Sequence, residues 1–97
     1  MKKYVIVRTY AMGVFAGTLE PESTETQKIL TEARRLWYWD GAASLSQLAM
    51  AGTKVPENCK FPAPVNRVEL TSPQGFEVLD VTDDARASIR SVKPWSR

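Results

Sequence analysis

Near its start the sequence carries the stretch KYVIVRTYAMGVFAGTL, residues 3–19, which is rich in β-branched and aromatic side chains. Such side chains favour strands, because they pack well on a pleated surface. We therefore expect strands over residues 3–10 and 14–19, paired as a hairpin across a turn or bulge at residues 11–13. Gly17 lies within the second strand, where its missing Cβ permits the close approach of another backbone or of a ligand.

Successive side chains of the first strand point to opposite faces of the sheet. By this spacing Arg8 and Tyr10 share one face of the strand. We expect the two residues to line a surface together with Phe15 of the second strand. For Arg8, a role in ligand binding and a plain exposed position are equally good interpretations.

Several further elements follow from turn residues and hydrophobic patterns. Residues 20–25 are polar, acidic and interrupted by a proline, so they predict an exposed loop, and residues 28–31 suit a short strand. Residues 65–70 predict another strand. Residues 76–81 predict its antiparallel partner, across a turn at residues 72–75.

Two helices are expected. The clearer one covers residues 42–52, where leucine and alanine side chains repeat at helical spacing and Gly52 provides a natural stop. Thr82 predicts the cap of a second short helix that runs to about Val92, with two aspartates at its positive end. Residues 56–64 contain three prolines and should be irregular.

The segment ARRLWYW, residues 33–39, fits a helix in its first half and a strand in its second. Three consecutive aromatic residues favour the strand, because their bulk restricts χ1 in a helix. We predict a strand, although the pattern alone leaves residues 33–36 open between the two states. A strand would place Arg35, Trp37 and Trp39 on one face and Arg34, Leu36 and Tyr38 on the other.

Together these elements predict one α+β domain over residues 1–97, a small antiparallel β-sheet of about five or six strands with two short helices. A domain of this length buries only about 60–70% of the surface of its unfolded chain. A deep ligand pocket is therefore difficult to form within a single chain.

The composition excludes several kinds of catalysis. The 97 residues include no histidine and one cysteine, Cys59. The Ser-His-Asp triad, the Cys-His dyad, His-ligated zinc and a histidine base are thus excluded, as are an internal disulfide and a Cys-rich metal site. We expect Cys59 to be a small buried core residue. The sequence predicts a binding protein, not an enzyme, with no metal and no cofactor.

Charge is nearly balanced, since 13 Lys and Arg residues against 11 Asp and Glu residues give a net charge of +2. Dedicated nucleic-acid-binding modules carry a larger basic excess on one face. The local basic clusters here favour a small anionic ligand over a long polyanion. We find no stretch that is long enough for a membrane span and no signal peptide, and with the free cysteine this predicts a cytoplasmic protein.

The densest candidate site lies in residues 34–39. Arg34 and Arg35 can donate paired hydrogen bonds to phosphate oxygens. The rings of Trp37 and Tyr38 can stack on a nucleobase. The alternative is that the aromatic rings belong to the core or to an interface while the arginines are solvated, and composition alone favours this alternative.

Two weaker candidates follow later in the chain. Asn58 can pair with a base edge and Lys60 with a phosphate. By itself this segment is better explained by Asn58 as a turn former and Phe61 as a core residue. Arg86 and Arg90 point the same way on the last helix and can hold an anion across a subunit boundary, but a solvated helix face is the default interpretation.

An unusual combination of motifs runs along the chain: VRTY at residues 7–10, GVFAG at 13–17, ARRLWYW at 33–39, GAASLSQLA at 41–49 and NCKFP at 58–62. This combination resembles a small phage-encoded family, the first-described Thoeris anti-defence proteins. The resemblance spans nearly the whole chain and leaves out the loop at residues 21–24 and the C-terminal tail.

The resemblance implies a sponge for immune signals, not a catalyst. Proteins of that family bind the cyclic ADP-ribose isomer that the Thoeris TIR protein makes from NAD, and members are also associated with cyclic oligonucleotides of the CBASS system. They form homodimers grouped into hexamers, with pockets at subunit boundaries, and act in the cytoplasm of the infected bacterium. Carried over to this chain, the expected contacts are to phosphates from Arg8, Arg34 and Arg35, to a base from Phe15 and Trp37 or Tyr38, and polar contacts from Asn58 and Lys60. Arg86 and Arg90 are lower-ranked additions, because the matching motifs do not include them.

Other interpretations use the same residues. The first is a small phage nucleic-acid-binding module, whose affinity would fall steeply with salt and rise with strand length. The second is a protein-binding inhibitor of a host factor, docked through the face that carries Trp37 and Trp39. An enzyme ranks third, and it would convert the signal into a product.

Overall fold

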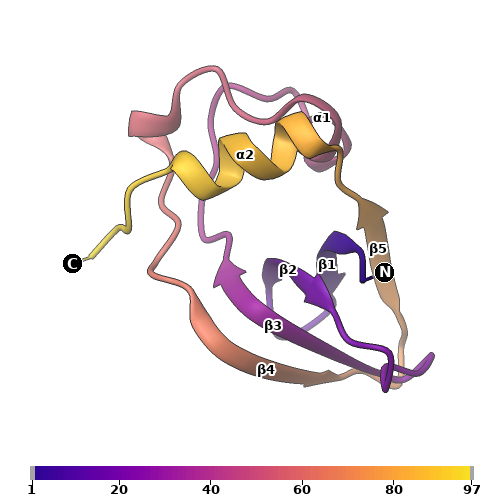
Figure 1. The fold of residues 1–97 in the computed structure, drawn as a ribbon. Coiled ribbons are helices and arrows are strands. Elements are labelled where there is room, and N and C mark those ends of the chain that lie inside the picture. The colour runs from indigo at the N-terminus through magenta and orange to yellow at the C-terminus, as the bar shows by residue number, and fades with distance from the viewer. Residues whose placement is uncertain (1, 97) are drawn as a thin grey trace.

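The computed structural model describes residues 2–96. Over that range the α+β fold is confirmed, with a five-stranded antiparallel sheet and two short α-helices (Figure 1). A single 3₁₀ turn, η1, lies within the same range. The elements in chain order are β1 (Tyr4–Thr9), β2 (Val14–Leu19), β3 (Gln27–Arg35), α1 (Leu45–Ala51), η1 (Pro56–Asn58), β4 (Val65–Thr71), β5 (Phe76–Asp80) and α2 (Asp83–Ser91).

The predicted hairpin of β1 and β2 is confirmed, but the predicted pairing of β4 with β5 is wrong. The strand order is β4-β3-β2-β1-β5, so the last two strands lie at opposite edges. Val78 of β5 pairs with Val7 of β1, and Glu69 of β4 pairs with Ile29 of β3. The reason lies in β1, where residues 4–7 are buried on both faces. A strand so enclosed needs a hydrogen-bonded neighbour on each side, because its backbone groups cannot bond to water.

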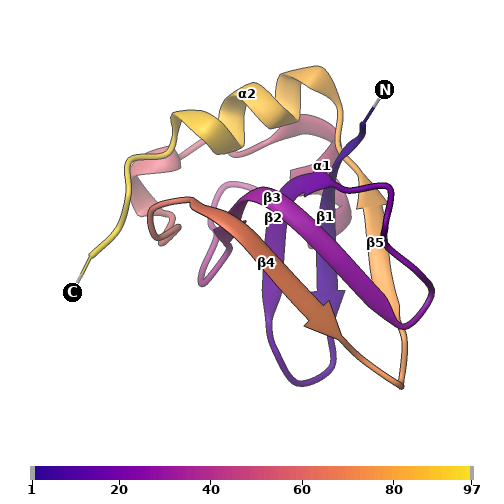
Figure 2. The ribbon, with the colours of Figure 1, turned by 60° about the horizontal axis from the view of Figure 1, so that its bottom comes forward.

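The sheet folds across itself, so that β3 and β4 pass in front of β2 and β1 (Figure 2). A bulge makes this bend possible. The register between β2 and β3 shifts after Ala16, and Glu32 on β3 adopts a positive φ of 48°. Gly17 lies opposite the bulge, where the backbone of β3 comes close. The close backbone approach expected at this glycine is therefore confirmed.

Hydrophobic side chains fill both sides of the folded sheet. On one side the helices cover a cluster that includes Ile6, Leu48, Phe61 and Ile89. On the other side the sheet encloses a second cluster by its own curvature. That inner cluster contains Val5, Val7, Phe15, Leu30, Ala33 and Leu70.

The predicted strand over residues 33–39 is correct only to Arg35. The amide of Leu36 donates to the carbonyl of Val14 at 2.9 Å, and Val14 is the first residue of β2. Gly13 before it has a positive φ of 93° and belongs to the turn, so the neighbouring strand offers no further partner. The chain therefore leaves the sheet at residues 36–39 and carries its aromatic side chains with it.

The two helices begin and end close to the predicted residues. Ser44 caps α1 by accepting a hydrogen bond from the amide of Gln47, and Gly52 ends the helix with a φ of 76°. The helix is shorter than predicted, because its N-terminal cap is Ser44 and not a residue near Ala42. Thr82 caps α2 by accepting from the amide of Ala85, as expected.

The predicted exposed loop after β2 has one buried residue. The carboxylate of Glu20 accepts from the hydroxyl of Thr31 at 2.6 Å and lies 2.8 Å from the ammonium of Lys2. The hydrogen bond from Lys2 and, to a smaller degree, the one from Thr31 hold the pKa of Glu20 below its ordinary value. Glu20 thus ties the N-terminal residues and β3 together, while the residues after it are mostly exposed.

Replacing Gly17 with alanine should destabilise the fold. An added Cβ would lie 3.0 Å from the carbonyl oxygen of Thr31 and 3.1 Å from Cα of Ala33. Both are backbone atoms, so relief requires opening the β2–β3 pairing, and we expect a loss of about 1–3 kcal/mol in the free energy of unfolding by urea. The neighbouring variant Thr18→Ala should lose less than about 1 kcal/mol. Equal urea midpoints for Gly17→Ala and the wild type would contradict the close approach.

Candidate functional site

Exposed aromatic rings gather where the chain leaves the sheet. Trp37 and Tyr38 keep 59% and 49% of their surface exposed. Lys60 holds this segment, since its amide donates to the carbonyl of Tyr38 at 2.8 Å and its carbonyl accepts from the amide of Trp37 at 3.1 Å. From the C-terminal tail, the amide of Trp95 donates to the carbonyl of Phe61 at 3.0 Å. We call Trp37, Tyr38, Lys60 and Trp95 the aromatic patch.

The side chains of the aromatic patch combine rings with a positive charge. The ring centroids of Trp37 and Trp95 lie 6.2 Å apart at an interplanar angle of 56°. The ammonium of Lys60 lies 5.9 Å from the ring centre of Tyr38 and 5.5 Å from that of Trp95. Such contacts orient a cation without neutralising it. The patch can therefore offer a ring face and a positive charge to the same ligand.

A hollow of about 340 Å³ lies beside Trp37. Arg35 and Trp39 also line it, so the three residues predicted to share a face do meet, although the strand ends at Arg35. The guanidinium of Arg35 donates to the carbonyl of Met12 at 2.8 Å and stacks 4.3 Å from the ring centre of Phe15. This contact fixes Arg35 at the rim of the hollow while the side chain stays exposed.

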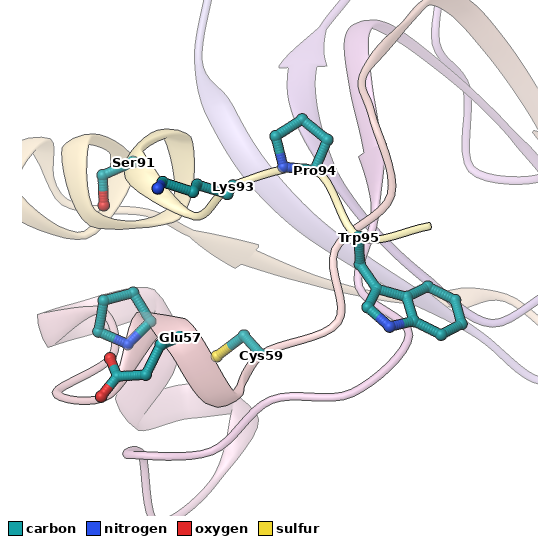
Figure 3. Close-up of a pocket in the computed structure, with 7 residues that line it drawn as sticks. Glu57, Cys59, Ser91, Lys93, Pro94 and Trp95 are labelled. Atoms are coloured by element: carbon teal, nitrogen blue, oxygen red, sulfur yellow. The ribbon is translucent and has the colours of Figure 1, made fainter. Parts of the chain in front are cut away.

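A second hollow, of about 410 Å³, lies on the other side of Trp95 (Figure 3). We call it the tail hollow, because η1 forms one wall and the residues after α2 form the other. Its lining residues are Pro56, Glu57, Cys59, Ser91, Lys93, Pro94 and Trp95. Trp95 belongs both to this hollow and to the aromatic patch, so the two form one continuous surface.

Asn58 lies near the aromatic patch but bonds within the protein. Its amide nitrogen donates to the carboxylate of Asp40 at 3.1 Å. The side chain remains exposed, and its predicted polar contact with a ligand stays a prediction. Cys59 is buried, as expected, with its sulfur 3.6 Å from the carbonyl of Asp40 and from the hydroxyl of Thr53.

Arg34 occupies a different place from the one predicted. Only 3% of its surface is exposed, because it points from β3 toward the side of the sheet that α2 covers. Its guanidinium donates to the carbonyl groups of Phe61, Pro62, Ile89 and Val92. Burial lowers the pKa of this guanidinium from its ordinary value, yet the group stays protonated. The predicted phosphate contact is contradicted, because these donors are already used by backbone carbonyls.

Phe15 and Arg8 also lie apart from the aromatic patch. Val7 pairs with Phe15 and Arg8 pairs with Val14, so Arg8 and Phe15 point to opposite faces of the sheet. The predicted shared face is therefore wrong. Phe15 is buried in the inner cluster and offers no free ring for base stacking, while exposed Arg8 lies 3.8 Å from the carboxylate of Glu77.

Arg86 and Arg90 are exposed on α2. Arg90 pairs with the carboxylate of Glu32 at 2.8 Å and lies over the ring of Tyr4 at 5.7 Å. With Tyr4, Glu32 and Arg34 it lines a separate hollow of about 150 Å³. A ligand contact of Arg86 or Arg90 across a subunit boundary stays a prediction.

A protein-family model described as a domain of unknown function, DUF6948, matches residues 2–89. The chain belongs to this family. No curated protein and no solved structure matches the sequence. The DUF6948 match contains Trp37, Tyr38 and Lys60 and ends before Trp95.

Two further observations concern residues 2–96. No helix in that range combines the length and the apolar composition needed to cross a membrane. Over the same residues, no group of three or more cysteine and acidic side chains is placed to hold a metal ion.

Sequence analysis missed the contribution of the C-terminal tail of this DUF6948 chain. Glu57, Lys93 and Trp95 line the tail hollow, and none was singled out. The sequence does contain one indication of this contribution. Trp95 follows Pro94 beyond the last helix, and a large ring in a short tail usually packs against another part of the protein. The contact with Trp37 joins residues far apart in the sequence, so spacing alone did not reveal it.

Replacing Arg34 should lower the free energy of unfolding strongly, as expected for a structural residue and not for one that only contacts a ligand. Arg34→Met removes the donors of buried carbonyl groups in two segments, and we expect the free energy of unfolding to fall by about 3 kcal/mol or more. Arg35→Met is the matched control, since Arg35 is exposed, and it should change stability by less than about 1 kcal/mol. Both values come from urea denaturation followed by circular dichroism. Similar stabilities for the two variants would contradict the structural role of Arg34.

Proposed function

We propose that this protein is a non-catalytic binder that captures a small cyclic nucleotide at the aromatic patch. The observation that carries this proposal is the position of Lys60, whose ammonium lies over the rings of both Tyr38 and Trp95, and Trp95 in turn contacts the exposed ring of Trp37. A nucleotide needs a ring face for its base and a positive charge for its phosphates. The aromatic patch offers both within one small area.

Arg35 extends the same surface. It lines the hollow of which Trp37 is also a wall, and its guanidinium donates to the carbonyl of Met12. A planar guanidinium can donate paired hydrogen bonds to phosphate oxygens. A cyclic ligand lying across Trp37 would thus meet a cation at each end, Lys60 and Arg35. Of the predicted phosphate contacts, Arg35 and Lys60 are the pair that the proposal retains.

The residue types present support a protein that binds its ligand and does not cleave it. The sequence contains no histidine, and its one cysteine is the buried Cys59. Cleavage of a phosphodiester or glycosidic bond requires a positioned base, acid, nucleophile or metal ion. The absence of histidine and the burial of the one thiol leave this surface without the imidazole and thiolate groups that most often do this chemistry.

The resemblance to the phage Thoeris anti-defence sponges supplies the biological role in this proposal. The ligand is then the cyclic ADP-ribose isomer of Thoeris, with cyclic oligonucleotides of CBASS as further signals, in the cytoplasm of an infected bacterium. The aromatic patch is open to solvent on a single chain. A second copy would provide the missing wall of the site, in accord with the homodimers and hexamers of that family.

The charge distribution favours such a small ligand over a nucleic-acid strand. Several basic side chains already face acidic ones across the surface, which leaves little continuous positive charge for a polyanion. The ion pairs in residues 2–96 are Lys2–Glu20, Lys3–Asp80, Arg8–Glu77, Arg67–Glu69 and Arg90–Glu32.

The exposed area of Trp37 and Tyr38 also favours a second candidate, docking onto a host protein. Tryptophan and tyrosine are enriched among the residues that dominate protein interfaces. The two candidates differ in one respect. Only the nucleotide binder has measurable affinity for the small molecule by itself.

Calorimetric titration with a cyclic ADP-ribose isomer tests the proposal. We expect saturable binding, and intact ligand should be recovered after heat denaturation of the complex. Trp37→Leu and Lys60→Gln should each weaken the affinity about tenfold or more, because each removes a ring face or a charge from the ligand. Lys54→Gln is the matched control, an exposed lysine outside the aromatic patch, and it should bind like the wild type.

The possible results separate the candidate functions. Recovery of a modified product would make the protein an enzyme. No binding at micromolar concentration would reject nucleotide capture and leave protein docking at the same rings. Affinity that rises with strand length and falls steeply with salt would indicate a nucleic-acid binder.

A further inference from the structure

The tail hollow contains a charged group of each sign beside an aromatic wall. Glu57 comes from η1 and Lys93 from the tail after α2, so the two residues lie on different walls of the hollow (Figure 3). Trp95 lies at its other end, and the ring of Pro94 adds apolar surface. At about 410 Å³, the volume is within the usual range for small-molecule sites.

The two charged groups are available to a ligand. Among residues 2–96, neither the carboxylate of Glu57 nor the ammonium of Lys93 has an ion-pair partner within 4.0 Å or a side-chain hydrogen bond. Both residues are exposed at the rim, so their charges remain solvated when no ligand is bound. Binding therefore does not first require an internal contact to break.

The chemistry of these groups matches three parts of a ribonucleotide. An ionised carboxylate only accepts hydrogen bonds, and its two oxygens fit the two hydroxyls of a ribose 2′,3′-diol. An ammonium group pairs with a phosphate, and an indole face stacks on a base. Glu57, Lys93 and Trp95 supply one group of each kind around a single hollow.

We propose that the tail hollow seats a ribose with a free 2′,3′-diol, and that Glu57 makes the protein prefer cyclic ADP-ribose isomers to 3′,5′-linked cyclic dinucleotides. This inference rests on the proposed function and deepens it by assigning the residue that would discriminate between its two ligand classes. A cyclic ADP-ribose keeps at least one ribose with both hydroxyls free. In a 3′,5′-linked cyclic dinucleotide every 3′ oxygen is esterified, so each ribose keeps only its 2′ hydroxyl and Glu57 has one donor fewer to accept from.

Trp95 connects this seat to the aromatic patch. Its ring is 6.2 Å from that of Trp37 on one side, and it lines the tail hollow on the other. A ligand in the tail hollow would therefore share Trp95 with the aromatic patch. Glu57 is a specificity-determining residue in this arrangement, and Trp95 contributes to the binding of both ligand classes.

Titration of two ligands against two glutamate variants tests the inference. The ligands are a cyclic ADP-ribose isomer closed by a ribose-to-ribose bond and 3′,3′-cyclic GMP–AMP. Glu57→Gln should weaken binding of the first about tenfold or more and that of the second clearly less, because the second offers this carboxylate one hydroxyl in place of two. Glu22→Gln, an exposed glutamate in the loop after β2, is the matched control. Trp95→Leu should weaken both ligands.

Each result decides between the two proposals. If the wild type binds neither ligand, both the proposed function and this inference fall. If the wild type binds but Glu57→Gln changes neither affinity, or reduces both equally, the diol seat is overturned while nucleotide capture stands. Unchanged melting temperatures of the variants exclude a folding defect as the cause.

Discussion

The buried guanidinium of Arg34 is the contact on which the candidate site depends. It lies on β3 and donates to carbonyl groups of two other segments, one before β4 and one at the end of α2. A buried charge is costly unless it is fully hydrogen-bonded, and backbone carbonyls at a helix C-terminus are good partners for a cation. One side chain therefore fixes the relative positions of the sheet, the irregular segment and the last helix.

The aromatic patch is a direct product of that arrangement. Lys60 directly precedes Phe61, whose carbonyl accepts from both Arg34 and the amide of Trp95. Trp37 lies two residues beyond the end of β3, the strand that carries Arg34. The patch thus consists of three exposed side chains and the half-buried Trp95 on a backbone that Arg34 and the Phe61 carbonyl hold in place. Its rings can be positioned for a ligand without being buried themselves.

Local chemistry made part of this structure predictable. Two runs of β-branched residues defined the first hairpin, and Ser44, Gly52 and Thr82 lie at helix ends for reasons visible in the sequence. The partners of β4 and β5 were not predictable from the closeness of these two strands in the sequence. They depend on β1, which needs a hydrogen-bonded neighbour on each edge. Arg34 and Arg35 are equally basic neighbours. Arg34 is buried and Arg35 is exposed because α2 covers only one face of β3, and which face it covers is decided by the tertiary structure.

The C-terminal tail after Val92 lies beyond the DUF6948 match, which covers residues 2–89. The backbone of Val92 is held by Arg34, whereas beyond it the tail is attached through the amide of Trp95 and the packing of its ring. The last few residues can therefore be exchanged without disturbing the sheet or the helices. A change in this short tail would then reshape the tail hollow and leave the sheet and the helices that carry it in place.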